Sequence, residues 1–381
     1  MSQTMKLAIV RQKYNPSGGA ERFVSRAIAA LAGSVEVTLI TRKWEDHAGY
    51  QSIKVDPFYL GSVWRDWSFA RGVAQAVRSQ PFDLVQSHER LPDCDLYRAG
   101  DGVHREWLAQ RTRQQSALGR LANQLNPYHH YAMWAESRLF HSPRLKAVIC
   151  NSQMVKDEIQ RWFGLPADKL HVIYSGIDAT NFHPETARQR RDVLRANLGI
   201  PAEVATLVYV GAGFERKGVA CCIRALAQAG GKAHLLVVGN DKKSSQYQQL
   251  AQQLNVSQRV HFVGAQKQVA DWYGAADALF LPTLYDPFPN VALEAFACGL
   301  PVLTSTKSGA AEFIREGQNG FVRDALDVAG FAALLAQRPH AADWQVMSEA
   351  ARQTILPYSP AAMGEALTRL YRQLLQAPPA A

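Results

Sequence analysis

The chain has 381 residues, of which 47% are hydrophobic and 20% charged, proportions that are ordinary for a soluble globular protein and that predict two domains. No apolar run reaches the roughly 18 residues of a membrane-spanning helix, and the N-terminus has no long apolar signal region, so we expect a cytoplasmic protein. The five scattered cysteines lack CxxC spacing, which argues against a disulfide framework or a zinc site and predicts small buried residues. The net charge is +9, and most of the surplus lies in the first 150 residues.

Short apolar strands alternate with helical segments along the chain. Strands that are apolar throughout predict parallel sheets covered by helices on both faces. The strands fall into two series, so we predict an α/β chain of two Rossmann-like domains, residues 1–175 and 176–358. An amphipathic helix at about 360–375 is expected to pack back on the first domain. The predicted strands are 6–12, 35–41, 82–88, 145–152 and 170–176, then 205–213, 233–241, 259–265, 277–283 and 301–306.

A glycine pair, Gly18 and Gly19, follows the first predicted strand and precedes a helix with an apolar face. Glycines at such a βα junction let a ligand approach the backbone and its N–H groups. We therefore predict that the pair contacts a bound donor molecule, although a tight turn alone would also require glycine.

The segment 104–146 is basic, with seven Lys and Arg against two acids, and it carries Trp and Tyr among the charges. Basic residues beside interfacial aromatics suit an anionic membrane surface or a phosphorylated lipid. A solvated helical hairpin with a Leu and aromatic core is equally compatible with the pattern. Nucleic acid is a weaker interpretation, because no binding motif accompanies the charge. The residues predicted to face a membrane or an acceptor are Arg105, Trp107, Arg111, Arg113 and Arg120.

The second domain opens with VGAGFERKG at 210–218, at the end of a predicted strand. This is not the GxGxxG dinucleotide fingerprint, because the position of its last glycine holds Arg216. Arg216 and Lys217 are expected where a helix begins, and cations there oppose the helix dipole unless an anion lies between them. We predict that the pair binds a diphosphate and neutralises it as the leaving group of a transfer reaction. Two solvated side chains are the structural alternative.

The stretch YDPFPNVALEAFACGLPVLTS at 285–305 contains Asp286 and, eight positions later, Glu294. If Asn290 caps a helix, one carboxylate precedes the helix and the other lies in its second turn. Both then approach a ligand at the helix N-terminus, where unpaired N–H groups favour an anion. A carboxylate can accept bonds from two neighbouring hydroxyls, so we predict that Glu294 binds a ribose and Asp286 a sugar. The backbone N–H groups from Phe288 to Val291, those of Asn290 and Val291 included, are expected to face the sugar and phosphate.

These motifs together resemble the retaining glycosyltransferases of family 4, which have the GT-B fold. That family combines a basic pair after the first strand of the C-terminal domain with an E-x7-E loop. GFERKGV, VVGNDK, VHFVGA, LEAFACGLPVLT and the N-terminal GGAER are similar, within the family, to the lipopolysaccharide core glucosyltransferases, over essentially the whole chain. Asp286 stands where the family has Glu, which shortens the reach of that carboxylate.

The resemblance implies two Rossmann-like domains that face a central cleft, the first binding the acceptor and the second the nucleotide sugar. The expected reaction moves a hexose, most simply glucose from UDP-glucose, to the heptose region of a lipopolysaccharide core with retention of configuration. Asp101 matches the position after the fourth strand that faces the reactive carbon of the sugar, so Asp101 and Asp286 are the predicted catalytic residues. The leaving phosphate is expected to take the acceptor proton, and no metal or cofactor is implied.

The resemblance also implies a cytoplasmic protein that is peripheral on the anionic inner leaflet of the membrane. The string Asp93-Cys94-Asp95 matches a DxD motif that binds metal in a different transferase fold, and we interpret it as coincidence. A nucleotide-sugar 2-epimerase of the same fold remains an alternative, as do transferases that use GDP-mannose, UDP-N-acetylglucosamine or UDP-galactose. A non-catalytic nucleic-acid or membrane-binding protein would explain the charge, but not a basic pair and two carboxylates at two βα junctions.

Overall fold

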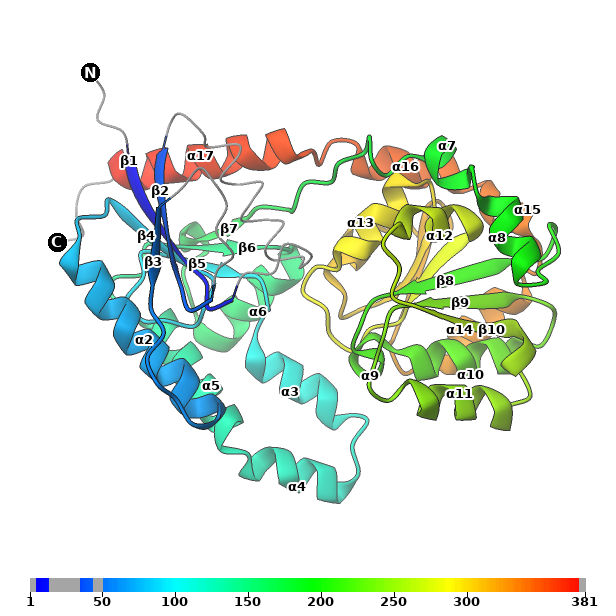
Figure 1. The fold of residues 1–381 in the computed structure, drawn as a ribbon, viewed down its shortest axis with the longest axis horizontal. Helices are drawn as coiled ribbons and strands as arrows, with labels where there is room; N and C mark the ends of the chain where they lie inside the picture. The colour runs from blue at the N-terminus through cyan, green and yellow to red at the C-terminus, as the bar shows by residue number, and fades with distance from the viewer. Residues whose placement is uncertain (1–4, 14–34, 44–50, 377–381) are drawn as a thin grey trace. The chain divides into compact units, whose positions relative to one another are not determined.

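The computed structural model describes residues 5–13, 35–43 and 51–376, and these form two compact units (Figure 1). The first unit comprises residues 1–176 together with the C-terminal segment from 360, and the second comprises residues 177–359. Gly18 and Gly19 lie outside the described residues. In the part of the chain that is described, every helix is too short or too polar to cross a membrane.

The first unit is built on a parallel sheet of order β3-β2-β1-β4-β5-β6-β7. Two of its strands, β3 and β5, are not among the predicted ones. The first has the sequence QSIK and lies at the sheet edge with mostly exposed residues, and the second is only four residues long and contains Arg98. Neither therefore shows the apolar run of a central strand. The strands are β1 (Met5–Val10), β2 (Val35–Thr41), β3 (Gln51–Lys54), β4 (Leu84–Ser87), β5 (Leu96–Ala99), β6 (Ala147–Cys150) and β7 (Leu170–Val172).

Helices cover both faces of this sheet (Figure 1). Successive residues of a strand point to opposite faces, so Ala8 and Val10 join the core under α2, α5 and α6, whereas Leu7 and Ile9 join the core under α17. The last helix thus returns from the far end of the sequence to close the first unit. The helices are α2 (Gly61–Ser79), α3 (His104–Thr112), α4 (Ala117–Leu125), α5 (Pro127–Phe140), α6 (Gln153–Phe163), η1 (Ala167–Lys169) and α17 (Pro360–Gln376).

The second unit has a parallel sheet of order β10-β9-β8-β11-β12-β13. Parallel strands present their carboxyl ends at one edge, and β8 pairs directly with β11, so the loops that follow these two strands are neighbours. The predicted site residues of the second domain lie in these two loops and the helices after them. The strands are β8 (Thr206–Val210), β9 (His234–Val238), β10 (Val260–Gly264), β11 (Ala278–Leu281), β12 (Val302–Ser305) and β13 (Gly320–Arg323), the last of which was not predicted.

Helices flank this second sheet as well, with α10 against α14 and α13 against α16 (Figure 1). Their central helices are almost wholly apolar, as in VACCIRALAQA of α10, because they are packed between the sheet and other helices. The helices are α7 (Pro184–Arg188), α8 (Arg191–Asn197), α9 (Phe214–Lys217), α10 (Val219–Ala229), α11 (Ser244–Gln253), η2 (Ser257–Arg259), α12 (Val269–Ala275), α13 (Asn290–Ala297), η3 (Gly309–Phe313), α14 (Val328–Ala336), α15 (Ala341–Gln345) and α16 (Ser348–Ile355).

Candidate functional site

The loop after β8 is shaped by glycines that no other residue could replace. Gly211 has φ of 138°, and a side chain there would meet Lys217, whose Nζ lies 3.0 Å from the position of a Cβ atom. Gly218 has φ of 84°, and a Cβ atom there would collide with the carbonyl oxygen of Pro282. Both positions have positive φ, which glycine adopts without strain, and Gly218 also allows the close approach of the Pro282 backbone. The glycines therefore bring α9 against the loop that follows β11.

Arg216 joins these two loops. Its carbonyl oxygen accepts the N–H of Leu284 at 2.8 Å, and its Nη1 donates to the carbonyl oxygen of Tyr285 at 2.8 Å. The next residue along the chain, Asp286, is 7% exposed, and its Oδ2 lies 3.5 Å from both Arg216 Nη1 and Lys217 Nζ. The structure therefore brings together three of the predicted site residues, two cations and one carboxylate, at the carboxyl edge of the second sheet.

This arrangement corrects the argument made for the basic pair. Arg216 and Lys217 lie in the last turn of the four-residue helix α9, just before α10, and cations are favourable at a helix C-terminus. Asp286 supplies an anion to both of them. A bound anion is therefore not needed to explain why the two cations lie here. Two cations and one carboxylate leave the cluster with one net positive charge, and the prediction that it binds a diphosphate depends on that charge.

The helix α13 begins at Asn290, but its N-cap residue is Pro289, which makes no side-chain capping bond, so the expectation that Asn290 is the cap was wrong. Asn290 and Val291 are instead the first two helical residues, whose N–H groups have no partner within the helix and point out of its N-terminus. These groups lie at the start of the same loop-to-helix connection that carries Asp286.

Glu294 lies in the second turn of α13 and is only 3% exposed. Its Oε2 accepts a hydrogen bond of 2.9 Å from the hydroxyl of Tyr273, which is fully buried in α12. The ring of Phe182 packs edge-on against Tyr273. The sequence did not single out Tyr273, since a tyrosine in an apolar helix is ordinarily a core residue. The hydrogen bond to Tyr273 fixes the Glu294 carboxylate between α12 and α13, and a ribose would have to bind it in that position.

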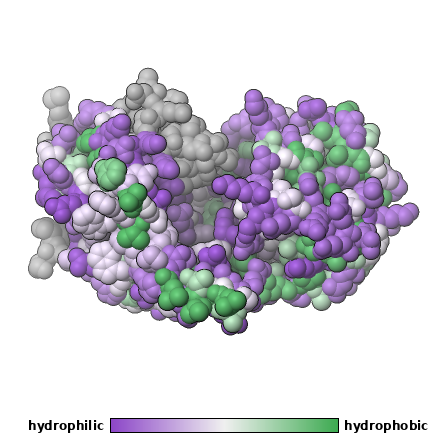
Figure 2. Space-filling view, turned by 60° about the horizontal axis from the view of Figure 1, so that its bottom comes forward, coloured by the Kyte–Doolittle hydropathy of each residue, from purple (hydrophilic) through white to green (hydrophobic). Residues whose placement is uncertain are grey.

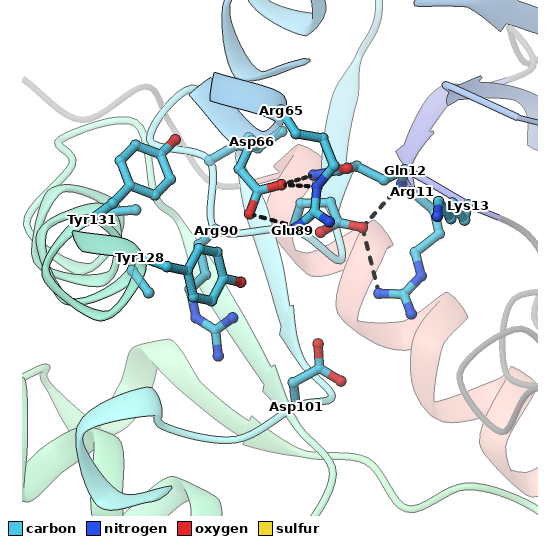
Figure 3. Close-up of a pocket in the computed structure, with 13 residues that line it drawn as sticks. Arg11, Gln12, Lys13, Arg65, Asp66, Glu89, Arg90, Asp101, Tyr128 and Tyr131 are labelled. Carbon is cyan, nitrogen blue, oxygen red and sulfur yellow. Dashed lines mark hydrogen bonds and ion pairs between the residues drawn. The ribbon is translucent and has the colours of Figure 1, made fainter. Parts of the chain in front are cut away.

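Asp101 lies in the first unit, after β5, the fifth strand rather than the fourth, and it is exposed. It lines a cavity of about 270 Å³ at the carboxyl edge of the first sheet (Figure 3). The wall is mixed in charge, and two phenol rings, Tyr128 and Tyr131 of α5, complete it. Its charged residues come from the segment after β1, from α2 and from the loops after β4 and β5: Arg11, Lys13, Arg65, Asp66, Glu89, Arg90 and Asp101.

Gln12 forms hydrogen bonds to two acidic residues of the cavity wall. Its backbone N–H donates to Glu89 Oε1 at 3.0 Å, and its side-chain amide donates to Asp66 Oδ1 at 2.9 Å. Arg65 Nε reaches the same Asp66 oxygen at 2.7 Å, and Arg11 Nη1 lies 3.5 Å from Glu89 Oε1. Burial raises the pKa of Glu89 above its ordinary value, and the Arg11 guanidinium opposes that rise. Sequence reasoning missed Glu89 and Asp66, because no motif marks them.

The basic segment 104–146 forms α3, α4 and α5, and its five predicted surface residues differ in exposure. Arg113 and Arg120 are exposed, whereas Trp107 and Arg111 are half-buried, with the Arg111 guanidinium 6.0 Å from the Trp107 ring. Arg105 is also half-buried, lies 5.2 Å from the ring of Phe163 and has a buried Nε atom. Part of the Arg105 side chain therefore packs against Phe163 within the unit, and its role at a membrane or acceptor surface stays a prediction.

The helix α4 has no buried residue. Leu118, Leu121 and Leu125 lie on one helical face and are 80%, 51% and 71% exposed. Further large apolar side chains are exposed before and within α2, including Phe58 and Leu60 at 78% and 75%. Figure 2 shows such hydrophobic groups gathered on one face of the first unit. Exposed apolar groups in this number mark an interaction surface.

The DxD string has a structural explanation. Asp95 is buried, its Oδ2 accepts the N–H of Val85 at 2.9 Å, and it pairs with Arg144 and Lys146 at 3.2 and 3.3 Å. Within the described residues, no three His, Cys, Asp or Glu side chains are grouped as metal ligands would be. The five cysteines are buried thiols, as predicted.

Comparison with known proteins divides the chain within about 15 residues of the boundary between the two units. The family model "Glycosyltransferase Family 4" matches residues 17–181, and "Glycosyl transferases group 1" matches residues 190–352. The chain is 29% identical over 325 residues to the lipopolysaccharide glucosyltransferase WaaG of Escherichia coli, covering 84% of this chain and 85% of that protein.

Solved structures agree on the architecture. A crystal structure of WaaG, a glycosyltransferase involved in lipopolysaccharide biosynthesis, is similar with a TM-score of 0.80 and 24% identity, over 96% of this chain and 99% of that one. Anabaena HepE, solved with UDP and glucose, is similar with a TM-score of 0.67 and 20% identity, over 97% of this chain and 100% of that one. These likenesses show the GT-B fold.

Proposed function

Since the chain belongs to the glycosyltransferases of group 1 and family 4 and has the GT-B fold, we propose that it transfers glucose from UDP-glucose to a heptose of a lipopolysaccharide core. The relative WaaG is a lipopolysaccharide glucosyltransferase, and the neighbour HepE has been solved with UDP and glucose. Both descriptions support glucose and a uridine nucleotide as the first donor to test.

The observation that carries the proposal is the cluster of Arg216, Lys217 and Asp286 beside the start of α13. Two cations and a helix N-terminus suit the two phosphates of a nucleotide sugar, and one carboxylate suits the hydroxyls of the sugar that these phosphates carry. In this proposal the second unit binds the donor, Asn290 and Val291 donate N–H groups to it, and Glu294 accepts from the ribose.

The proposed mechanism is transfer with retention on one face of the sugar. The bond from the anomeric carbon to the diphosphate oxygen breaks, the acceptor oxygen bonds to that carbon, and the leaving phosphate takes the acceptor proton. Lys217 and Arg216 stabilise the negative charge that develops on the phosphate, so the chemistry calls for no metal ion. Asp286 orients a donor hydroxyl, and its pairing with both cations holds all three groups in place before the donor binds.

The acceptor belongs, in this proposal, to the first unit. Asp101 lines the cavity of about 270 Å³ in that unit, where a carboxylate can orient a hydroxyl and stabilise positive charge at the anomeric carbon. A glycolipid acceptor also requires a lipid surface. The leucine face of α4, with Arg113 and Arg120 nearby, is proposed to lie on the anionic inner leaflet of the membrane.

The test is thermal stabilisation of the purified protein by UDP, GDP and ADP and by their sugar conjugates, followed by release of the nucleoside diphosphate. A ligand of the folded state raises the melting temperature by mass action, so UDP and UDP-glucose should raise it and GDP-mannose should not. Release of UDP from UDP-glucose should then increase when a core lipopolysaccharide ending in heptose is added.

Two outcomes would overturn parts of the proposal. Stabilisation by a different nucleotide sugar, such as UDP-N-acetylglucosamine alone, would replace the donor and leave the reaction class. Conversion of the donor to a single isomerised product without acceptor would instead identify a nucleotide-sugar 2-epimerase. If no nucleotide raises the melting temperature, the proposed donor site in the second unit is wrong.

A further inference from the structure

We infer that the cavity of the first unit binds one sugar residue of the acceptor, and that Glu89 contacts the hydroxyls of this sugar. The inference rests on the proposed function and extends it to a residue that no motif marks. Its ligand class is a polyhydroxylated ring, and its evidence is the size of the cavity, the mixed character of the wall and the hydrogen bonding of Glu89.

The size of the cavity limits what it can hold. Pockets for drug-sized ligands occupy about 300 to 1,000 Å³, and this one, at about 270 Å³, lies just below that range. A space of this size accommodates a single sugar ring. Its opening lies at the carboxyl edge of the sheet, where parallel α/β units bind their ligands.

The lining has the chemistry that a sugar ring needs. Carboxylates accept bonds from hydroxyls, guanidinium groups donate to ring and hydroxyl oxygens, and a phenol ring offers a flat surface to the C–H face of a sugar. Figure 3 shows Asp66 and Glu89 close together, with Tyr128 and Tyr131 on α5 beside Asp66 and Asp101 set apart from the two acids. These groups surround one space from several elements.

The wall is also held rigid before any ligand binds. Both oxygens of Asp66 are used by Arg65, at 2.7 and 3.2 Å, and one of them also by Gln12. Arg90 Nε donates to the buried Glu136 at 3.1 Å. A preorganised wall reduces the entropy cost of binding. Asp66 thus positions Arg65 and Gln12, and its own capacity for a ligand is smaller than that of Glu89.

Glu89 differs from Asp66 in how its oxygens are used. Only Oε1 is occupied, by the Gln12 N–H at 3.0 Å and by Arg11 at 3.5 Å. Among the described residues Oε2 has no hydrogen-bond or ion-pair partner, although burial raises the pKa of this carboxyl. The Glu89 side chain is 21% exposed and lines the cavity, so its second oxygen is accessible to a ligand and can accept hydrogen bonds from it. Sugar hydroxyls would supply the missing donors.

The experiment measures binding directly, by isothermal titration of the full chain with a defined probe. The probe is the heptose-containing oligosaccharide released from a lipopolysaccharide that is truncated after its inner-core heptoses. Glu89→Gln should weaken binding of this probe by about tenfold or more, because an amide replaces one charged acceptor with a donor. The matched control Glu365→Gln changes an exposed glutamate of the same unit, on α17, and should leave binding unchanged.

A second variant guards against loss of the fold. Glu89→Asp keeps the charge and the partner Arg11 but withdraws the carboxylate by one methylene, and it should also weaken probe binding. For both variants the melting temperature and its increase with UDP should match those of the parent protein, because the donor site belongs to the second unit.

The outcomes separate this inference from the proposed function. If the parent protein does not bind the probe, or if both Glu89 variants bind it within twofold of the parent, the inference is wrong even where glucose transfer is observed. If binding depends on Glu89 but no glucose is transferred from UDP-glucose, the sugar site stands and the proposed reaction falls.

Discussion

At the scale of single residues, the cluster of Arg216, Lys217 and Asp286 shows how one set of charges can serve structure and chemistry together. The carbonyl oxygen and one guanidinium nitrogen of Arg216 form hydrogen bonds to the backbone of the neighbouring loop. The Lys217 side chain forms no hydrogen bond to that loop and, among the described residues, pairs only with Asp286. Lys217 is therefore the better residue with which to separate a catalytic role from a structural one.

Lys217→Ala should reduce transfer from UDP-glucose by about a hundredfold or more, since it removes one group that stabilises the developing phosphate charge. The melting temperature should fall only modestly, because Asp286 keeps its ion pair with Arg216 when Lys217 is removed. The comparison is Lys232→Ala, an exposed lysine before β9 at the opposite edge of the sheet. Unchanged transfer in the Lys217 variant would remove this residue from the mechanism.

His104 makes stability depend on pH. It is 9% exposed, its Nε2 lies 3.1 Å from Nδ1 of His129, and burial lowers its pKa to about 3. In the unfolded chain the pKa is about 6.5, so below that pH the unfolded state binds more protons. The stability that His104 contributes is complete above pH 6.5 and is lost as the pH falls toward 3.

The melting temperature of the parent protein should therefore fall more steeply between pH 7 and pH 5 than that of His104→Gln, which cannot titrate at this position. His141→Gln, at an exposed histidine after α5, is the control and should follow the parent. Equal slopes for parent and His104→Gln would show that protonation of His104 does not limit stability.

At the scale of secondary-structure elements, the helices differ in whether their apolar face is covered by protein. The apolar residues of α17 are buried against the first sheet, whereas the leucines of α4 face outward although α4 has a comparable amphipathic pattern. Both helices carry apolar residues on one face, so the sequence pattern does not tell them apart. Only the packing against the sheet distinguishes the core helix from the surface helix.

Replacing Leu118, Leu121 and Leu125 together by Gln should weaken binding to anionic vesicles by about a thousandfold or more, since each leucine buried in the membrane contributes roughly 1.5 to 3 kcal/mol. The melting temperature should not fall, because these side chains contact no core. Val346→Gln, at a valine of the second unit that is 82% exposed, serves as the control. Full vesicle binding by the triple variant would assign α4 to another partner.

At the scale of the whole molecule, the C-terminal helix begins at Pro360 and completes a unit whose first strand begins at Met5. Met363, Leu367, Leu370 and Tyr371 share a core with strands β1, β2, β4, β5 and β6. The Tyr371 hydroxyl also donates to Gln86 at 2.6 Å. The order of the elements in the sequence and their partners in space therefore differ.

Removal of residues 360–381 should unfold the first unit and leave the second folded. Each buried large side chain contributes about 2 to 5 kcal/mol, so four of them approach the whole stability of a domain. Hydrogen exchange should become fast in β1 and β4 while β8 and β9 stay protected, and UDP should still stabilise the second unit. A chain that ends at Gln376 is the control. Retained protection of β1 would show that α17 is dispensable.

The sequence by itself was sufficient for the fold class and for most strands, because a buried parallel strand must be apolar along its whole length. It was insufficient for β3, β5 and β13, which are short or partly exposed, and for the N-cap of α13, which is Pro289 rather than Asn290. The pattern of apolar residues within a strand does not indicate the position of that strand in the sheet.

The chain also marked Arg216, Lys217, Asp286 and Glu294 without a structure, because charged residues are conspicuous in apolar βα junctions. Only the tertiary structure decided their partners: Asp286 lies between the two cations, and Tyr273 anchors Glu294. Glu89 became visible only there as well, since the wall of its cavity comes from strands and helices that are distant in the sequence. A hydrogen bond between such residues leaves no local signal, because it depends on the packing of the whole unit.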